Sequence, residues 1–440
     1  MKPVKIGILG LGTVGGGTVN VLARNGQEIT RRAGREIRVV QASARDLKKR
    51  RACFLEGIEL VPDPHTITRN PEIDVVVELM GGDEPARTLV LEAIAQGKHV
   101  VTANKALIAV HGNEIFTQAQ KKGVMVAFEA AVAGGIPIIK CLREGLAGNR
   151  IEWLAGIING TSNFILSEMR DKGVDFADVL KEAQRLGYAE ADPTFDVEGI
   201  DAAHKLTILA AIAFGIPLKF KQVFIEGISK ITRMDVQYAE NMGYRLKLLG
   251  IARRTQDGIE LRVHPTLIPA RRLLANVDGA MNAVLVKGDA VGATMFYGAG
   301  AGAEPTASAV VADLVDIART LAMDANNRVP HLAFQPDALM DTPILPIEDV
   351  ETSYYLRLHA ADKPGVLADV TRILGDLNIS IESILQKEPH AGETTVPVII
   401  LTQRVREKNM NEAIARIEKL ASITGRVVRI RLEHLNPDWN

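Results

Sequence analysis

Cysteine is scarce in this chain of 440 residues, which contains only Cys53 and Cys141. The two thiols lie far apart in the sequence and form no CxxC or other ligand spacing. The sequence therefore indicates neither a disulfide framework nor a cysteine-based metal site, and it favours a reducing compartment. We expect a cytoplasmic protein with free thiols.

Charge of one sign and long hydrophobic runs are also lacking. The formal net charge is -1, so neither a nucleic acid nor a membrane surface is an expected partner. The longest apolar run, residues 206–218, is too short and too broken to span a bilayer. Residues 1–23 place two lysines before a small apolar run, as a signal peptide does, but their regular glycines favour a strand and a turn.

Histidine patterns typical of metal enzymes are missing as well. The nine histidines show no HExxH or paired spacing, so metal-assisted hydrolysis is not indicated. A phosphorylating semialdehyde dehydrogenase would need an activated cysteine with a histidine partner. Cys141 lies in a helical pattern with no nearby histidine, and Cys53 lies beside a charged segment, so the sequence gives this alternative little support.

The first 130 residues contain a regular alternation of strand and helix patterns. Five short buried strands are predicted, at residues 4–10, 37–43, 74–79, 98–103 and 124–129. Such alternation predicts a doubly wound parallel sheet with helices on both faces, the Rossmann arrangement of the α/β class. We assign residues 1–133 to this NAD(P)-binding domain.

A glycine pattern follows the first predicted strand directly. Gly10, Gly12 and Gly15 form a GxGxxG where the strand turns into a helix. Glycines at this junction allow a dinucleotide pyrophosphate to approach the helix N-terminus, and Thr13 and Val14 would supply backbone amides there. The alternative is a glycine-rich turn without a ligand.

The second strand ends with a basic residue. Arg45 stands where NAD-specific sites usually carry an acid, with Asp46 one place later. An arginine suits a 2'-phosphate, so NADP is the expected cofactor and NAD the alternative; residues 48–51 could equally be a solvated charge run. Lys105 follows another strand at its carboxyl end, where α/β sheets place ligands, although a surface lysine at a helix start is the alternative.

Residues 183–205 concentrate acids before one lysine. Four carboxylates, Glu190, Asp192, Asp196 and Glu198, lie in a predicted loop. Asp201 and Lys205 then stand four residues apart in an apolar helical pattern, so they share one face. An ordinary helix ion pair is one reading. The other is a site for a cationic ligand such as an amino-acid ammonium group, because unpaired acids beside an apolar helix are costly to bury.

The same segment resembles the signature of the homoserine dehydrogenase family, and the resemblance extends over essentially the whole chain. The matching positions are Ala183, Gly187, Tyr188, Asp192, Pro193, Asp196, Val197, Gly199, Asp201 and Lys205. The resemblance implies that Lys205 is the general acid/base, that Asp201 orients the substrate hydroxyl, and that Glu190 and Asp196 bind the substrate. It also implies that Lys105 reaches both cofactor and substrate.

The implied reaction is reversible NAD(P)-dependent hydride transfer between L-homoserine and L-aspartate 4-semialdehyde, in threonine, methionine and isoleucine biosynthesis. The resemblance further implies a monovalent cation such as sodium, held by Glu129 and by backbone oxygens of Val132, Gly134 and Ile136. Hard cations prefer oxygen ligands, and a glycine-rich turn exposes carbonyls. From the residues alone this turn could be only a hinge between domains.

Residues 134–325 read as a mixed sheet backed by helices, an α+β substrate-binding, catalytic and dimerisation domain. The segment NGTSN, with Gly160 and Thr161, matches a family turn that faces the substrate, although it could be a plain Asx turn. We interpret residues 305–325 as a helix that returns to the Rossmann domain, with Gly302 near the cofactor. The family forms homodimers or homotetramers through this region.

After a linker at 326–350, residues 351–440 show the order strand, helix, strand, strand, helix, strand, a ferredoxin-like pattern. Asp362, Gly365 and Asn378 occupy turns that resemble those of an ACT domain, a module that binds amino acids. Threonine is the implied effector, and a dimerisation domain without a ligand is the alternative. We expect this domain to be separable from an active enzyme.

The sequence as a whole predicts an oxidoreductase. The other class of function is a non-catalytic amino-acid sensor, in which a cofactor fold and an ACT domain regulate a partner. The complete arrangement of acids and lysines argues against a sensor, and no DNA-binding helix pair is evident.

Overall fold

The structure is a computed structural model that describes residues 2–386 and 394–435. The chain forms two compact units, each made of three segments. The first comprises Met1–Gly160, Ile200–Val223 and Ala280–Thr342. The second comprises Thr161–Gly199, Phe224–Gly279 and Pro343–Asn440.

A six-stranded parallel sheet forms one half of the first unit, in the order β3-β2-β1-β4-β5-β6. Its strands are β1 Val4–Leu9, β2 Ile37–Ser43, β3 Glu59–Val61, β4 Val75–Glu78, β5 His99–Thr102 and β6 Val126–Ala127. The order reverses beside β1, which makes the carboxyl ends of β1 and β4 the expected ligand crevice. The predicted doubly wound α/β fold is confirmed.

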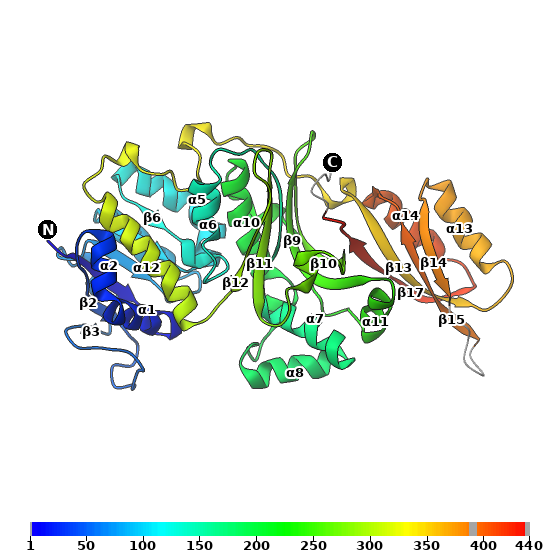
Figure 1. Ribbon diagram of the computed structural model, residues 1–440, viewed down its shortest axis with the longest axis horizontal. Helices are drawn as coiled ribbons and strands as arrows, with labels where there is room; N and C mark the ends of the chain where they lie inside the picture. The colour runs from blue at the N-terminus through cyan, green and yellow to red at the C-terminus, as the bar shows by residue number, and fades with distance from the viewer. Residues whose placement is uncertain (1, 387–393, 436–440) are drawn as a thin grey trace. The chain divides into compact units, whose positions relative to one another are not determined.

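Helices cover both faces of this sheet. They are α1 Thr13–Arg24, α2 Gly26–Ala33, α3 His65–Arg69, α4 Ala86–Ala95, α5 Lys105–Lys122 and α12 Ala303–Thr320. The yellow helix α12 lies along the blue helix α1, although almost 300 residues separate them in the chain (Figure 1). A Cβ at Gly17 would lie 2.5 Å from the carbonyl oxygen of Ala303, so this close packing requires glycine.

The rest of the first unit contains an antiparallel ribbon and a buried helix. The strands are β7 Ile151–Ile157, β11 Met281–Gly288 and β12 Gly292–Ala299, with β11 paired to both others. Helix α10, Ile200–Phe214, packs against α5 and is buried from Asp201 to its end. A helix that is apolar on all sides is expected to lie inside a protein. The short helix α6 is Ile138–Lys140.

The second unit is built on one sheet in the order β9-β10-β17-β13-β15-β14. The strands are β9 Tyr244–Arg254, β10 Ile259–Pro269, β13 Glu351–Ala361, β14 Ile381–Gln386, β15 Thr395–Thr402 and β17 Ile423–Leu432, with β8 Phe224–Ile225 beside β10 and β16 Val405–Arg406 beside β13. Strand β17 pairs in parallel with β10, so the C-terminal sheet continues the sheet of β9 and β10.

The C-terminal part has the predicted order of elements, with α13 Val366–Asp376 and α14 Glu407–Ile417 completing it. The ferredoxin-like prediction is confirmed. Strand β17 of this part is hydrogen-bonded to β10 of the middle of the chain, a pairing that the sequence did not predict. Sequence patterns predict strands and do not show which remote strands pair.

The other helices of the second unit are α7 Gly160–Lys172, α8 Phe176–Leu186, α9 Thr194–Val197 and α11 Arg233–Asn241. Two departures from expectation concern them. The NGTSN segment, predicted as a turn, is the first turn of α7, because serine, threonine and asparagine are also favoured at helix starts. The acid-rich loop contains the short helix α9. No helix of the described residues is long and apolar enough to cross a membrane.

Candidate active site

The turn between β1 and α1 has the geometry of a phosphate cradle. Gly10 has a φ of +97°, which disfavours any other residue. A Cβ at Gly15 would lie 2.1 Å from the carbonyl oxygen of Gly10, whereas a Cβ at Gly12 would meet nothing within 4 Å. The first residues of α1, Thr13 and Val14, have backbone amides without intrahelical partners. The loop is therefore tight on its protein side and open where a pyrophosphate would approach.

The end of β2 lies beside this loop. The hydroxyl of Ser43 accepts a hydrogen bond of 3.3 Å from the Gly10 amide. Arg45 follows two residues later and is exposed. The carboxylate of Asp46 accepts the backbone N–H groups of Lys48 and Lys49, at 2.9 and 3.2 Å. Arg45 therefore lies exposed just beyond the end of β2, while the Asp46 carboxylate stabilises the turn that follows.

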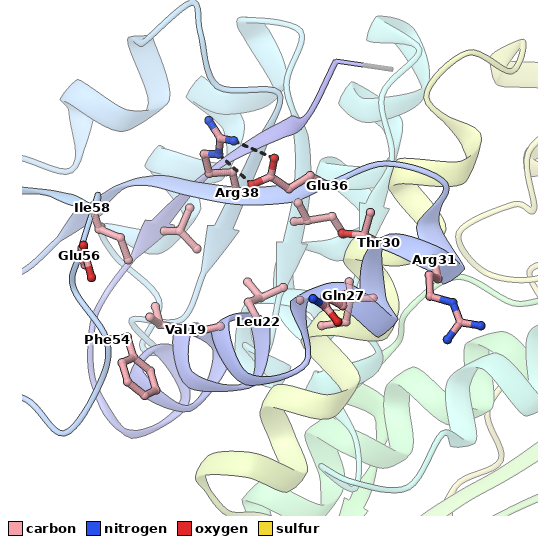
Figure 2. Close-up of a pocket in the computed structure, with 15 residues that line it drawn as sticks. Val19, Leu22, Gln27, Thr30, Arg31, Glu36, Arg38, Phe54, Glu56 and Ile58 are labelled. Carbon is pink, nitrogen blue, oxygen red and sulfur yellow. Dashed lines mark hydrogen bonds and ion pairs between the residues drawn. The ribbon is translucent and has the colours of Figure 1, made fainter.

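A separate hollow of about 700 Å³ lies on the same part of the molecule (Figure 2). Its lining includes Val19 and Leu22 of α1, Phe54, and Arg38, which bonds Glu36 at 3.0 and 2.7 Å. No predicted cofactor residue lines this hollow. It is distinct from the glycine-rich cradle.

The predicted acid/base pair forms at the start of α10. The ammonium nitrogen Nζ of Lys205 lies 2.7 Å from Oδ2 of Asp201 and donates to the carbonyl oxygen of Ile158 at 2.8 Å. Asp201 is 2% exposed and Lys205 9%. Asn159 donates its side-chain amide to Asp201 Oδ2 at 2.8 Å. Asn159 and the Ile158 carbonyl were not among the predicted site residues, although Asn159 opens the NGTSN motif.

A second lysine reaches the same carboxylate. Nζ of Lys105 lies 3.0 Å from Oδ1 of Asp201. Lys105 is the first residue of α5, whose N-terminus is capped by the side chain of Asn104. Burial alone would raise the pKa of Asp201, but the charges of Lys205 and Lys105 outweigh it and hold that pKa well below its usual value. Asp201 is thus a carboxylate shared by two ammonium groups.

His204 is next to Lys205 in the chain. Its ring stacks on Phe220 with centroids 4.1 Å apart. Burial lowers its pKa to about 4, so the ring is neutral near pH 7.

The predicted substrate residues Thr161, Glu190 and Asp196 belong to the second unit, whereas Gly160 belongs to the first. The Thr161 hydroxyl donates to the backbone oxygen of Tyr188 at 2.7 Å. The backbone oxygen of Asp196 accepts a bond of 2.9 Å from the hydroxyl of Ser162. These bonds tie the start of α7 to the acid-rich loop, in which the Glu190 side chain is exposed.

Glu129, predicted as a cation ligand, is 3% exposed. Its two carboxylate oxygens accept the backbone N–H groups of Ile139 and Lys140, at 3.0 and 2.7 Å. Burial nevertheless raises the pKa of Glu129 to about 7. A nearby cation would favour the ionised form, so the residue fits this role. The following turn bends through Gly134 at a φ of +46°.

The C-terminal domain has a hollow of about 190 Å³ at its first turn. Asp362 and Gly365 line this hollow, and Gly365 precedes α13 with a φ of +93°. Asn378 has a φ of +56° and does not line it. The structure thus brings two of the three predicted effector residues together.

Comparisons with known proteins agree along the chain. Family models match as "Homoserine dehydrogenase, NAD binding domain" over residues 10–129, "Homoserine dehydrogenase" over 137–315 and "ACT domain" over 354–421. The homoserine dehydrogenase of Pseudomonas aeruginosa is 66% identical over 436 residues, covering 99% of this chain and 100% of that protein.

Solved structures give the same result. A homoserine dehydrogenase from Thiobacillus denitrificans is 69% identical, with 99% of both chains covered and a TM-score of 0.94. A hyperthermophilic archaeal homoserine dehydrogenase in complex with NADPH is 25% identical, with 72% of this chain and 97% of that chain covered and a TM-score of 0.60. Because the agreement extends over the cofactor, catalytic and C-terminal regions, the chain belongs to the homoserine dehydrogenase family and is an oxidoreductase that acts on a CH–OH group.

Proposed function

We propose that Lys205 is the proton donor and acceptor in reversible hydride transfer between L-homoserine and L-aspartate 4-semialdehyde. The observation that supports this role is the buried contact of Lys205 with Asp201, a carboxylate that also contacts Lys105. A buried amine held next to a carboxylate in a cofactor enzyme is suited to proton transfer.

A bound nicotinamide cofactor would supply or accept the hydride. During reduction, the charged Lys205 gives a proton to the carbonyl oxygen as it becomes a hydroxyl. During oxidation, the neutral amine takes that proton back, so high pH favours oxidation only. Asp201 orients the amine toward the reacting oxygen, and Asn159 fixes the carboxylate through its amide.

Substrate binding is assigned to the acid-rich loop and the start of α7. Glu190 and Asp196 supply negative charge for the substrate ammonium group, and Gly160 and Thr161 lie at the helix start that would meet it. Lys105 would contact both substrate and cofactor. The bonds from Thr161 and Ser162 to the loop support this assignment, because they hold the start of α7 against the loop that carries Glu190 and Asp196.

The cofactor preference follows from Arg45. We assign NADP, with NAD as the weaker ligand, because an exposed guanidinium at the end of β2 pairs with a 2'-phosphate. The NADPH complex of the archaeal relative supports this choice. The pyrophosphate would bind the cradle of Gly10, Gly12 and Gly15, with Gly302 nearby at the start of α12.

A sodium ion is assigned to Glu129 and the carbonyl oxygens of Val132, Gly134 and Ile136. A buried carboxylate with a raised pKa gains stability from a counter-charge, and the turn supplies neutral oxygens.

The C-terminal domain is assigned to threonine sensing through the hollow at Asp362 and Gly365, and its match to the ACT family supports an amino-acid effector. We also propose a cytoplasmic homodimer or homotetramer that acts in threonine, methionine and isoleucine biosynthesis.

The direct experiment is an absorbance assay of the purified protein with homoserine and each cofactor in turn. We expect reduction of NADP at a higher kcat/KM than reduction of NAD. A folded protein that turns over neither cofactor would support the alternative of a non-catalytic sensor.

A further inference from the structure

Arg431 of β17 contacts two glutamates that come from different elements. Its Nε and Nη2 lie 2.7 and 2.5 Å from the two carboxylate oxygens of Glu407, the first residue of α14. Its Nη1 lies 2.7 Å from Oε2 of Glu226, which follows β8. The Arg431 and Glu407 side chains are 1% and 2% exposed, and that of Glu226 is 34% exposed. Bidentate pairing of this kind fixes direction as well as distance.

Neighbouring groups reinforce this bridge. The Arg431 guanidinium lies 4.7 Å from the ring centroid of Phe224, and Arg429 lies 3.3 Å from Glu407 and 3.9 Å from Glu226. The hydroxyl of Tyr354 in β13 lies 3.3 Å from Oε2 of Glu407. Strand β13 ends next to the turn that carries Asp362 and Gly365. Strand β13 therefore runs from Tyr354 beside the bridge to Ala360 and Ala361, which line the hollow of the C-terminal domain.

The segment after Glu226 is pressed against the acid-rich loop. A Cβ at Gly227 would lie 2.4 Å from Oε2 of Glu198 and 2.5 Å from the carbonyl oxygen of Val197, so no side chain fits between them. The backbone amide of Ile228 donates to the same Val197 oxygen at 2.8 Å. A displacement of Glu226 would therefore also displace Gly227 and Ile228. These two residues contact the end of α9, the helix that carries Asp196.

We propose that Arg431 and Glu226 are positioning residues that hold the acid-rich loop from the C-terminal domain. The inference depends on the proposed role of that loop in substrate binding, and it adds the route by which the C-terminal domain acts on it. When Glu226 and Glu407 share Arg431, the loop is fixed in the conformation that binds homoserine. A shift of α14 or β17 changes the position of Glu226 and weakens substrate binding, with no direct effect on hydride transfer.

The test is Glu226→Gln in the full-length protein, because Glu226 is one-third exposed and the substitution keeps the side-chain volume. We expect the KM for homoserine to rise about threefold to tenfold while kcat stays within about twofold, the result of losing ground-state binding only. The KM for the nicotinamide cofactor should not change. Amide hydrogen exchange across residues 188–199 should become faster.

Arg431→Lys provides an independent measurement, since lysine keeps the charge but cannot reproduce the bidentate contact with Glu407 together with the contact to Glu226. Its effect on the KM and that of Glu226→Gln should be non-additive in the double variant, because both remove one contact. Arg406→Gln is the matched control. Arg406 pairs with Glu351 on an exposed part of the same domain, and its substitution should change neither KM nor kcat.

Three results would overturn the proposal, and they are distinguishable. An unchanged KM in Glu226→Gln, with a raised KM in Glu190→Gln, would leave the loop as the substrate site and remove the coupling. An unchanged KM in both variants would contradict the proposed role of the loop in substrate binding, and it would contradict the coupling as well. A fall in thermal stability with equal losses in kcat and kcat/KM would show a purely structural role and would also overturn it.

Discussion

At the scale of single residues, the shared carboxylate of Asp201 determines how a proton can move. Two ammonium groups contact it, so Asp201 stays ionised. Lys205 is the more buried of the two, with 11% of its side chain exposed against 37% for Lys105. Lys205 is therefore placed for proton transfer, and Lys105 is accessible to a ligand at the sheet edge.

Lys205→Ala should reduce kcat by about 10²-fold to 10⁴-fold, because it removes the proton-transfer group, and it should leave cofactor affinity nearly unchanged. Steady-state kinetics and fluorescence titration with NADPH measure the two quantities. Lys219→Ala is the control, since Lys219 is equally buried and pairs with Asp341. If the activity of Lys205→Ala lies within tenfold of that of the unsubstituted enzyme, Lys205 is not the proton-transfer group.

Arg45→Ala should weaken NADP binding by about 1.5 to 3 kcal/mol through loss of a charged hydrogen bond, and NAD binding by much less. Calorimetric titration with both oxidised cofactors gives the comparison. Equal losses for the two would mean that Arg45 only contacts the adenine.

At the scale of elements, hydrophobic runs and glycines predicted the parallel strands well. A strand that is buried on both faces has a nearly continuous hydrophobic sequence, which is easy to recognise. The sequence could also predict the contact of Asp201 with Lys205, since two residues that are four positions apart on a helix lie on the same face. It could not predict that Asn159 and the Ile158 carbonyl complete that contact. A polar side chain in a turn-like segment has many possible partners, and a backbone carbonyl carries no sequence signal.

Strand β6 depends on two neutral histidines. His99 Nδ1 accepts the Met125 amide at 2.9 Å, and His331 Nε2 accepts the Val126 amide at 3.1 Å. Burial and nearby arginines lower the pKa of each ring to about 4. Protonation places a hydrogen on the accepting nitrogen, so each bond is lost when its ring becomes charged.

Acid should therefore destabilise the protein. The stabilisation is complete above the unfolded histidine pKa of about 6.5 and is lost as the pH falls from there through about 4, with a loss on the order of 3 kcal/mol for each ring. Urea unfolding at pH 7, 5.5 and 4.5 measures this loss. His331→Gln, whose amide oxygen can accept the Val126 bond without titrating, should show a shallower slope. Identical slopes for the two proteins would contradict the explanation.

At the scale of the whole chain, the C-terminal domain shares a buried charge network with the middle of the sequence. Arg262 of β10 is 1% exposed and lies 2.5 Å from Glu433 and 2.9 Å from Glu260. Strand β17, which immediately precedes Glu433, pairs with β10 at Thr266. No pattern in the sequence connects these residues, because pairing between remote strands depends on the completed fold.

Truncation before Glu351 should therefore leave a poorly folded protein and not the active, unregulated enzyme expected from the sequence. It exposes the edge of β10 and takes Glu433 from the buried Arg262. Size-exclusion chromatography and circular dichroism should show aggregation. The full-length variant Glu433→Gln should lower the free energy of unfolding by about 3 kcal/mol or more. A soluble truncated protein with unchanged thermal stability would refute this prediction.

The pairing of β17 with β10 also has a consequence for biosynthesis of the chain. Strand β10 leaves the ribosome more than 150 residues before β17 does, so for many seconds its residues Thr266 and Leu267 lack their partner strand while translation continues. Contacts of such long sequence separation form slowly, because a large loop must close first. The second unit can therefore complete its sheet only after β17 has been made, and chaperone dependence should be greatest before that stage of synthesis.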